Sequence, residues 1–496
     1  MGGKLETVGI YHDNACQSYS SKAPFHPSQI PTGYLFPETC VDVDNAVYAG
    51  VLELLQSIGK NKPGFEKENP LSWLVHPGDI VVVKPNLICE SHVHRPEEWD
   101  YIVTHGSIVR AVVDCVLAVL KGSGKVVIAD SPQTDSDFEK TVLRNGLAEI
   151  VRFYQDNGYP VTLLDLREER WFAQNGVISR REDLPGDPLG FVTVDLAEES
   201  TFDSYTKNGR FYGAYYDTKD LSQYHSQANH RHAYSVSKTC LDCDVFINVP
   251  KMKTHKKAGI TLSMKNLVGI CTHKNSLPHH SLGTPDAKGD EYPGSGRLER
   301  TLVMAAAVKR KIMTIFGPAA AGIVNRTKNA IDSRLSDEQK IVRSGNWFGN
   351  DTIWRTIVDL NRILFWYDAE GVRRTSPRLY LSIVDGIIAG EGEGPMAPDR
   401  KPVGLLFGGT NPVAVDAVGA RLMGFDYHKI PYITGALQPM TLPIVDPTMD
   451  LDDIEVQSNT PELSGRLGSL KHPGFAFRPP TGWKGHIELD KSNDEP

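Results

Sequence analysis

The sequence predicts an α/β protein built on a mainly parallel sheet of βα units, with two long irregular insertions and a Pro-rich C-terminal tail. Short β-branched runs alternate with stretches of helical apolar spacing, which is typical of βα units. The alternation lapses over residues 167–235 and 272–296, which are polar, aromatic or rich in His, Gly and Pro. Beyond about residue 434 the chain is Pro-rich and loosely patterned.

Three strands are expected in the first part of the core. They are the runs DIVVVKPN (79–86), KVVIADSP (125–132) and PVTLLDL (160–166). Apolar residues at helical spacing predict a helix over residues 104–124, capped by Thr104 or Ser107, and another over residues 138–154. This part of the chain therefore reads as βαβαβ.

The βα pattern resumes after the first irregular stretch. The segments expected there are a strand over 243–251, a helix over 259–270, helical material at 297–316 and 350–367, strands over 378–386 and 403–409, and a helix over 411–424. Asn411 is the expected cap of that last helix and Gly424 its stop.

We divide the 496 residues into seven segments, since the chain exceeds one average domain of about 150 residues. They are an N-terminal extension (1–42), a first βα segment of the core (43–166), an insertion or cap (167–235), a core segment with the KMKTH motif (236–271), a His/Gly-rich and helical insertion (272–377), a core segment with the DGIIAGEGEGP motif (378–433) and a C-terminal tail (434–496).

The composition of the chain argues against two classes of protein, nucleic-acid-binding and membrane-spanning. The chain carries 53 Lys and Arg against 61 Asp and Glu, a net charge of −8, which argues against a nucleic-acid partner. A positive site must therefore be local, and local sites suit small anions. No uninterrupted apolar run is long enough to span a membrane, because Lys309, Arg310 and Lys311 break the best candidate. A helix lying on a membrane surface stays an alternative there.

The cysteines and the N-terminus favour a cytoplasmic protein. Seven cysteines, an odd number, fit reduced thiols better than a disulfide framework. Cys240 and Cys243 form a lone C-x-x-C, and no ferredoxin-type run is present, so we expect no iron–sulfur cluster. The N-terminus lacks the apolar region of a signal peptide. A homo-oligomer is compatible with the sequence.

Polar residues stand at the carboxyl ends of four predicted strands. They are Lys84 and Asn86, Asp130 and Ser131, Lys251 and Lys253, and Asp385. In open α/β sheets ligands bind at these ends, near a reversal of strand order. The alternative for each residue is a solvated loop position, but four strands together indicate one site.

The run VPKMKTHKKAG (249–259) gathers four lysines and His255 in an acidic chain. In the helix predicted after it, Thr261, Lys265 and Asn266 recur among apolar residues. An unpaired buried ammonium is costly, so these side chains are expected to face a pocket. The alternative is that Lys265 reaches solvent from a surface turn.

Glycines and acids follow the strand that carries Asp385. The stretch DGIIAGEGEGPMAP lacks the lysine of a P-loop, and its Glu391 and Glu393 suit a divalent metal or acid–base chemistry. A tight solvated turn is the alternative.

Histidines suggest a second kind of site. His92 with His94, and His230 with His232, stand two residues apart, as two metal ligands on one strand would. His105 is better placed to meet an anion, because it opens the helix after the first strand.

Several motifs together resemble the DUF362 family. They are GDIVVVKPNL, THGSIVRAVVD, KVVIADSP, DVFINVPKMKTHKKAGITLSMKNLVGI, IVDGIIAGEGEGPM and NPVAVDAVGARLMGFD. The resemblance implies functional positions at Lys84, Asn86, His105, Arg110, Asp130, Ser131, Lys251, Lys253, His255, Thr261, Lys265, Asn266, Asp385, Glu391 and Asp416. Many relatives look like ferredoxin fusions, which implies redox chemistry in part of the family, but this chain lacks the cluster motif.

We expect an enzyme that binds a small anionic substrate, phosphorylated, nucleotide-linked or carboxylated, with a sugar as the first class to test. Lys84, Lys251, Lys253 and Lys265 would hold the anion, with Asn86, His105, Arg110, Ser131, Thr261 and Asn266 around it. His255 or Lys253 would move a proton.

Asp130, Asp385 and Glu391 would act as acid and base or hold a divalent cation, Mg²⁺ or Mn²⁺ ahead of Zn²⁺ or Fe²⁺. Two alternatives stay open. One is a redox or transition-metal enzyme with His and Cys ligands, and the other is a non-catalytic protein that binds an anionic ligand.

Overall fold

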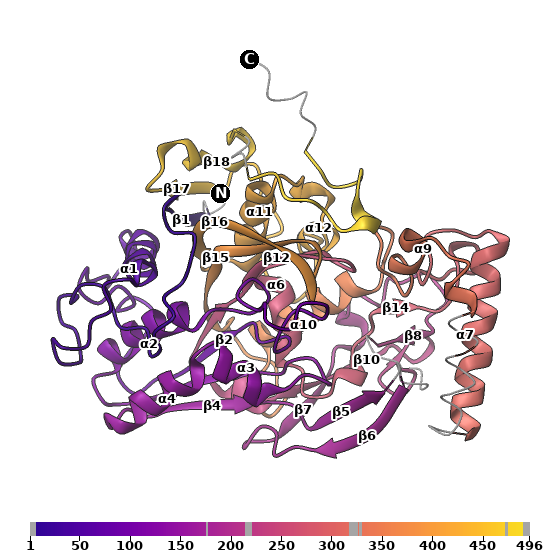
Figure 1. Ribbon diagram of the computed structural model, residues 1–496, viewed down its shortest axis with the longest axis horizontal. Coiled ribbons are helices and arrows are strands. Elements are labelled where there is room, and N and C mark those ends of the chain that lie inside the picture. The colour runs from indigo at the N-terminus through magenta and orange to yellow at the C-terminus, as the bar shows by residue number, and fades with distance from the viewer. Residues whose placement is uncertain are drawn as a thin grey trace.

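A single large mixed sheet occupies the centre of the molecule (Figure 1). The computed structural model describes residues 6–174, 177–213, 221–316, 326, 330–471 and 475–489. The strands of the sheet are β1 (Thr7–His12), β2 (Ile80–Pro85), β3 (Lys125–Asp130), β4 (Val161–Asp165), β11 (Val245–Val249), β12 (Lys251–His255), β13 (Gly259–Thr261), β15 (Leu379–Glu393), β16 (Ala397–Gly409), β17 (Glu455–Ser458) and β18 (Gly465–Arg466).

The sheet order is β18-β17-β1-β16-β15-β11-β2-β3-β4, with β12 paired to β15 and β13. From β15 to β4 every neighbouring pair is parallel, so the prediction of an α/β protein with a mainly parallel sheet is confirmed. The chain builds β2, β3 and β4 outward on one side and β11, β15 and β16 on the other. Strand order therefore reverses between β2 and β11, which is the point where ligands bind in such sheets.

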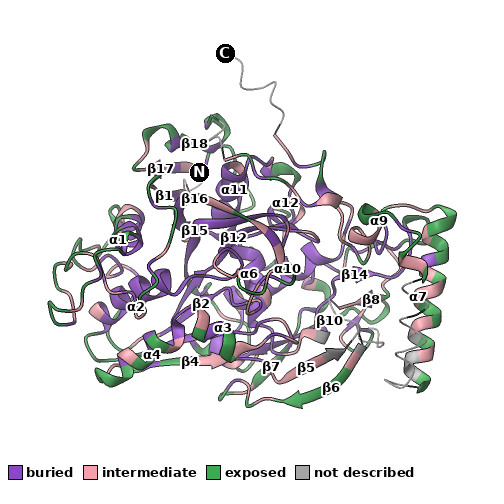
Figure 2. Cartoon of the chain, viewed as in Figure 1, coloured by how far each residue is buried: buried purple, intermediate pink, exposed green. Residues whose placement is uncertain are grey.

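Helices cover both faces of the sheet. Successive side chains of a strand point to opposite faces, and because both sets are apolar here, each face needs a covering layer. Val81 and Val83 belong to one apolar layer, and Val82 between them belongs to the other. The first layer includes buried residues of α1 (Ala46–Gly59), α2 (Gly106–Leu120) and α4 (Leu147–Asp156). The second includes those of α6 (Ser263–Asn266), α10 (Ile353–Trp366), α11 (Pro412–Met423) and α12 (Pro431–Ala436). Buried residues fill the centre accordingly (Figure 2).

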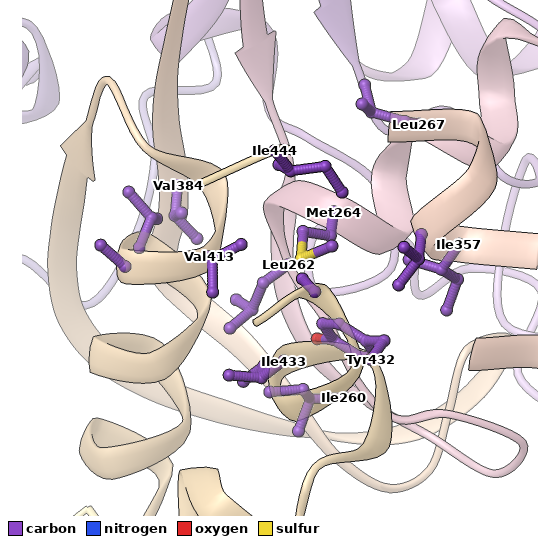
Figure 3. Packing of buried hydrophobic residues seen from close by; sticks show 14 of the residues in the cluster. Ile260, Leu262, Met264, Leu267, Ile357, Val384, Val413, Tyr432, Ile433 and Ile444 are labelled. Carbon is purple, nitrogen blue, oxygen red and sulfur yellow. The ribbon is translucent and has the colours of Figure 1, made fainter. Parts of the chain in front are cut away.

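The second layer holds the segment that carries the KMKTH motif. Ile260, Leu262 and Met264 follow β12 and belong to the same buried cluster as Ile357 of α10 and Ile433 of α12 (Figure 3). Burying a side chain of this size contributes roughly 1.5–3 kcal/mol. Thr261 lies between these apolar residues, and Lys265 and Asn266 lie between Met264 and the buried Leu267, so their apolar neighbours anchor all three.

Small sheets and helices lie outside the central sheet. They are β5 (Glu169–Gln174) with β6 (Val177–Asp183), β7 (Phe191–Asp195) with β10 (Arg231–Ser237) and β9 (His225–Ser226), β8 (Phe211–Tyr212) with β14 (His280–Ser281), and the helices α3 (Phe138–Arg144), α5 (Lys238–Asp242), α7 (Arg297–Phe316) and α9 (Asp337–Ile341). The pairing of β8 with β14 brings the two irregular stretches, 167–235 and 272–296, into contact.

Two helix predictions were wrong in detail. Residues 138–154 form two helices, α3 and α4, because the chain turns at Gly146, whose φ of 79° suits glycine. The cap of α2 is neither Thr104 nor Ser107: the His105 side chain accepts the backbone N–H of Ser107.

Tertiary pairing overrode the pattern in the motif segments. The expected helix over 259–270 begins as strand β13, because residues 259–261 pair with β12, and only 263–266 are α-helical. The KMKTH residues beyond the strand expected over 243–251 form a further strand, β12, beside β15. The glycine-rich stretch is also strand, since β15 continues to Glu393 and pairs with β16.

No helix within the described ranges is long and apolar enough to cross a membrane. The cytoplasmic location stays a prediction.

Close contact between β15 and β16 provides a test of the sheet. A Cβ on Gly408 would lie 2.1 Å from the backbone oxygen of Ser382. We expect Gly408→Ala to lower the free energy of unfolding by about 1–3 kcal/mol in urea titrations, because backbone must move. Gly213→Ala, whose Cβ would meet nothing closer than 3.8 Å, is the matched control. Equal stabilities would contradict this packing.

Candidate functional site

A cavity of about 420 Å³ opens where strand order reverses. The ends of β2 and β3, strand β12 with the turn after it, and α6 all contribute to its wall. Residues predicted for the site that line it are Asn86, Asp130, Ser131, Lys253, His255, Thr261, Lys265 and Asn266. Predicted site residues that do not line it are Lys84, His105, Arg110, Lys251, Asp385 and Glu391.

Buried lysines dominate the cavity. Burial, reinforced by neighbouring lysines, lowers the pKa of Lys257 and Lys265 to about 7 each and that of Lys274 to about 8. Burial likewise lowers the pKa of Lys253 to about 7. A cluster of desolvated amines with lowered pKa values is typical of a functional site, since nothing in folding requires it.

The lysines differ in what they bind. Lys253 Nζ donates to the Ile102 carbonyl and, at 3.3 Å, to Asn86 Oδ1. Lys274 Nζ donates to the Val268 carbonyl at 2.8 Å, and Lys257 Nζ to the Ser344 carbonyl. Lys265 is 9% exposed, and its Nζ has no hydrogen-bond or ion-pair partner within the described part of the chain. Carbonyl contacts leave the positive charge of the others uncompensated.

A chain of asparagine amides holds the floor of the site. Asn266 Nδ2 donates to Asn248 Oδ1 at 2.8 Å, and Asn86 Nδ2 donates to Asn266 Oδ1 at 3.0 Å. This directs Asn86 Oδ1 towards Lys253. Asp416 holds the start of α6 by accepting the backbone N–H groups of Ser263 and Met264, so the lysine that follows is fixed in place.

Two neutral histidines line the cavity, and the Nε2 atom is a hydrogen-bond donor in one and an acceptor in the other. His255 Nδ1 accepts the backbone N–H groups of Lys257 and Ala258, which leaves its proton on Nε2. His279 Nδ1 lies 2.8 Å from the Leu277 carbonyl and must donate to it, so His279 Nε2 is an acceptor. Burial and nearby lysines lower the pKa of His279 to about 3 and that of His255 well below its usual range. The cavity thus has one imidazole donor and one imidazole acceptor.

Lys84 lies beneath the cavity, paired with Asp130. Lys84 Nζ is 2.7 Å from Asp130 Oδ1, and Asp130 Oδ2 accepts the backbone N–H of Leu87. A Cβ on Gly269 would lie 2.0 Å from Asp130 Oδ1, so glycine there leaves room for the pair. Lys84 is therefore a partner of Asp130 and does not reach the cavity.

Lys251 and Asp385 form a second buried pair. Lys251 Nζ lies 3.1 Å from Asp385 Oδ2, and Tyr19 OH donates to Asp385 Oδ1 at 2.6 Å. The backbone N–H of His105 donates to the same carboxylate, and the His105 ring stacks on Tyr19 at 4.0 Å. Arg110 pairs with its neighbour on α2, Asp114, at 2.9 Å.

The three carboxylates predicted to hold a metal do not converge. Asp130 and Asp385 each pair with a lysine, and Glu391 pairs with Arg478 at 2.9 Å and Lys401 at 3.1 Å. Across the described residues no group of three or more His, Cys, Asp or Glu side chains is placed to hold a metal ion.

The histidine and cysteine side chains suggested as metal ligands do not form a common site among the described residues either. His92 Nε2 contacts Arg95 at 2.9 Å, His230 pairs with Asp203 at the surface, and His232 is buried. Burial raises the pKa of Cys240 to about 12, which disfavours the thiolate that a metal or redox centre needs.

Several lining residues escaped the sequence analysis. They are Lys256, Lys257, Lys274, His279, Ser344, Asn346, Pro395 and Met396. The KTHKK run contains Lys256 and Lys257, but its pattern does not distinguish them from solvated surface lysines. Lys274 and His279 come from the His-rich block. Only the tertiary structure shows that this block lies at the strand ends, so no sequence pattern indicated these two residues.

The Lys84–Asp130 pair yields a stability test. Lys84→Met leaves a buried carboxylate without its cation, and we expect a loss of about 3–5 kcal/mol in the free energy of unfolding. Lys84→Met/Asp130→Asn should recover much of that loss, and the exposed Lys140→Met should change stability by less than about 0.5 kcal/mol. A single variant as stable as the double would contradict the pairing.

Comparisons with known proteins identify a family. Residues 81–181 and 183–421 match the family described as "Domain of unknown function (DUF362)". The thylakoid-associated protein sll1697 of Synechocystis sp. (strain ATCC 27184 / PCC 6803 / Kazusa) is 24% identical over 357 residues, 72% of this chain and 67% of that protein.

Solved structures resemble the chain only weakly. A Thermotoga maritima protein is similar with a TM-score of 0.30 at 11% identity, over 72% of this chain and 55% of its own. The lactate racemase apoprotein of Thermoanaerobacterium thermosaccharolyticum has a TM-score of 0.30 at 9% identity, over 75% and 55%. The chain thus spans just over half the length of either structure, and scores this low carry no argument. The family match covers well over half of the sequence, and the chain belongs to the DUF362 family.

Proposed function

We propose that this protein is an enzyme acting on a small anionic molecule, carrying carboxylate or phosphate, that binds in the cavity at the strand ends. One observation carries the proposal: five lysines line a single cavity of an acidic chain. Of the two acids that line it, Asp130 is already neutralised by Lys84. An anion entering the cavity would meet a strong excess of positive charge.

The buried lysines of the cavity lack a counter-charge from the protein. Lys253, Lys257 and Lys265 lose solvation on burial, and carbonyl or amide contacts do not replace a counter-charge. A bound carboxylate or phosphate supplies that charge through charge-assisted hydrogen bonds. Anion binding is therefore favourable because it gives the buried lysines the counter-charge that the protein does not supply.

The imidazoles supply the chemistry. His255 Nε2–H can donate a proton or hydrogen bond to a developing oxyanion, and His279 Nε2 can accept a proton. His279 is a weak base in the empty cavity because of the adjacent lysines. A bound anion offsets those charges and raises its basicity towards a useful range.

The volume of the cavity suits a phosphorylated sugar or a small carboxylic acid, since ligand sites of roughly 300–1,000 Å³ are usual. Any divalent cation would arrive with a phosphorylated or nucleotide-linked substrate, because Asp130, Asp385 and Glu391 already have cationic partners. A non-catalytic binding protein is the alternative that turnover assays decide.

Removing the cavity's charge tests the anion site. We expect Lys265→Met and Lys274→Met each to weaken binding of sugar phosphates by about 10- to 100-fold, because one charge-assisted hydrogen bond contributes about 1.5–3 kcal/mol. Calorimetric titration measures this, with Lys140→Met as the control for a lysine on the surface. Unchanged affinity in both cavity variants would refute the site.

The lowered lysine pKa values predict linked proton uptake. Lys253 and Lys257, with pKa values of about 7, are largely neutral at pH 8, and an anion favours their charged forms. Binding should therefore take up protons, and affinity should fall as pH rises from 7 to about 9. Sulfate, which does not titrate in this range, is the probe.

Calorimetry in buffers of different ionisation enthalpy measures the uptake directly. Heats that do not depend on the buffer, with an affinity that is constant with pH, would mean that these lysines stay charged.

A further inference from the structure

Lys265 stands apart from the lysines around it. The side-chain nitrogens of Lys253, Lys257 and Lys274 each donate to a backbone carbonyl. Lys265 lines the same cavity and is nine-tenths buried as a residue, and its Nζ has no such partner within the described ranges. Lys256, the fifth lysine of the cavity wall, is more exposed, so Lys265 is the buried lysine whose amine is free for a ligand.

The surroundings of Lys265 favour a neutral amine. Lys253, Lys274 and Lys257 all act on it as neighbouring cations, and solvent is largely excluded. A lysine that is desolvated beside other cationic groups is the arrangement that makes an amine nucleophilic near neutral pH. The same neighbours would hold a carboxylate or phosphate within reach of that amine.

We propose that Lys265 forms an imine with the carbonyl group of an anionic substrate, a 2-oxo acid or a ketose or aldose phosphate. This rests on the proposed anion site and names its substrate class. In the step the Nζ lone pair attacks the carbonyl carbon, a C–N bond forms, and the C=O double bond opens to a carbinolamine. One amine proton moves to the carbonyl oxygen as the carbinolamine forms, and loss of that hydroxyl with the second amine proton releases one water and leaves a C=N bond.

The histidines match the two proton movements in this step. His255 Nε2–H donates to the carbonyl oxygen as negative charge develops on it. His279 Nε2 carries the two amine protons in turn from the nitrogen to that oxygen, the first to form the hydroxyl of the carbinolamine and the second to release it as water. Both rings line the cavity with Lys265.

Position favours Lys265 over the other amines. It follows Asp416-capped residues on α6, so its backbone is fixed. Lys253 is fully buried and donates to Ile102 and Asn86, which suits it to holding charge rather than attacking a carbonyl.

Reductive trapping tests the imine. The full-length protein is incubated at pH 7.5 with pyruvate or dihydroxyacetone phosphate, with and without sodium cyanoborohydride, and digested for peptide mass spectrometry. We expect a reduced adduct on Lys265 with at least one of the two probes, and which probe reacts separates a 2-oxo acid from a sugar phosphate. Lys265→Arg should lose the adduct and keep the fold by circular dichroism, whereas the surface variant Lys140→Arg should keep the adduct.

The outcomes separate this inference from the function on which it rests. Probe binding by calorimetry without any adduct on Lys265 overturns the imine and leaves the anion site standing. Absence of probe binding overturns both. An adduct spread equally over exposed lysines such as Lys121 and Lys140 is ordinary surface glycation and also overturns the imine. Should Lys265→Arg unfold, site-resolved mapping on the unmodified sequence decides alone, because the adduct is either on Lys265 or elsewhere.

Discussion

Compensation of buried charge at the carboxyl ends of the strands is the constraint on which the rest of the structure depends. Lys84 on β2 pairs with Asp130 on β3, and Lys251 on β12 pairs with Asp385 on β15, all four side chains being almost fully buried. Breaking such a pair costs far more than forming it contributes. These pairs fix the strands in register at the edge where the cavity opens.

The lysines of the cavity are the exception to that compensation. Lys257, Lys265 and Lys274 are desolvated without a carboxylate partner, although the chain has more acids than bases. A protein selected for stability alone would pair or expose them. Their arrangement costs free energy unless a counter-charge is present, which is the pattern expected of a functional site.

Segments outside the central sheet and turns between its strands complete the wall of the site. Lys274 and His279 come from the block after the KMKTH segment, Ser344 and Asn346 from the chain after α9, and Met396 from the turn between β15 and β16. The rigid sheet supplies the floor, and segments without regular secondary structure supply part of the wall. Loops carried by a rigid scaffold are where specificity is usually set.

The sequence by itself determined the α/β class, because β-branched runs and helical spacing reflect local geometry that tertiary contacts did not reverse. It also pointed to Asn86, Asp130, Lys253 and Lys265, because strand ends and an apolar helix face constrain where polar groups go. Only the tertiary structure decided which charges pair and which stay open. Lys84 and Lys253 both stand near the carboxyl end of a predicted strand. Lys84 forms an ion pair with Asp130 on the neighbouring strand, whereas Lys253 contacts only the neutral Asn86 and a carbonyl.

The same reason explains why KMKTH and the glycine-rich stretch are strands, and why the irregular block directly after the KMKTH segment contributes Lys274 and His279 to the site. Strand pairing and ion pairing depend on partners far along the chain, and no local pattern encodes which partner is met.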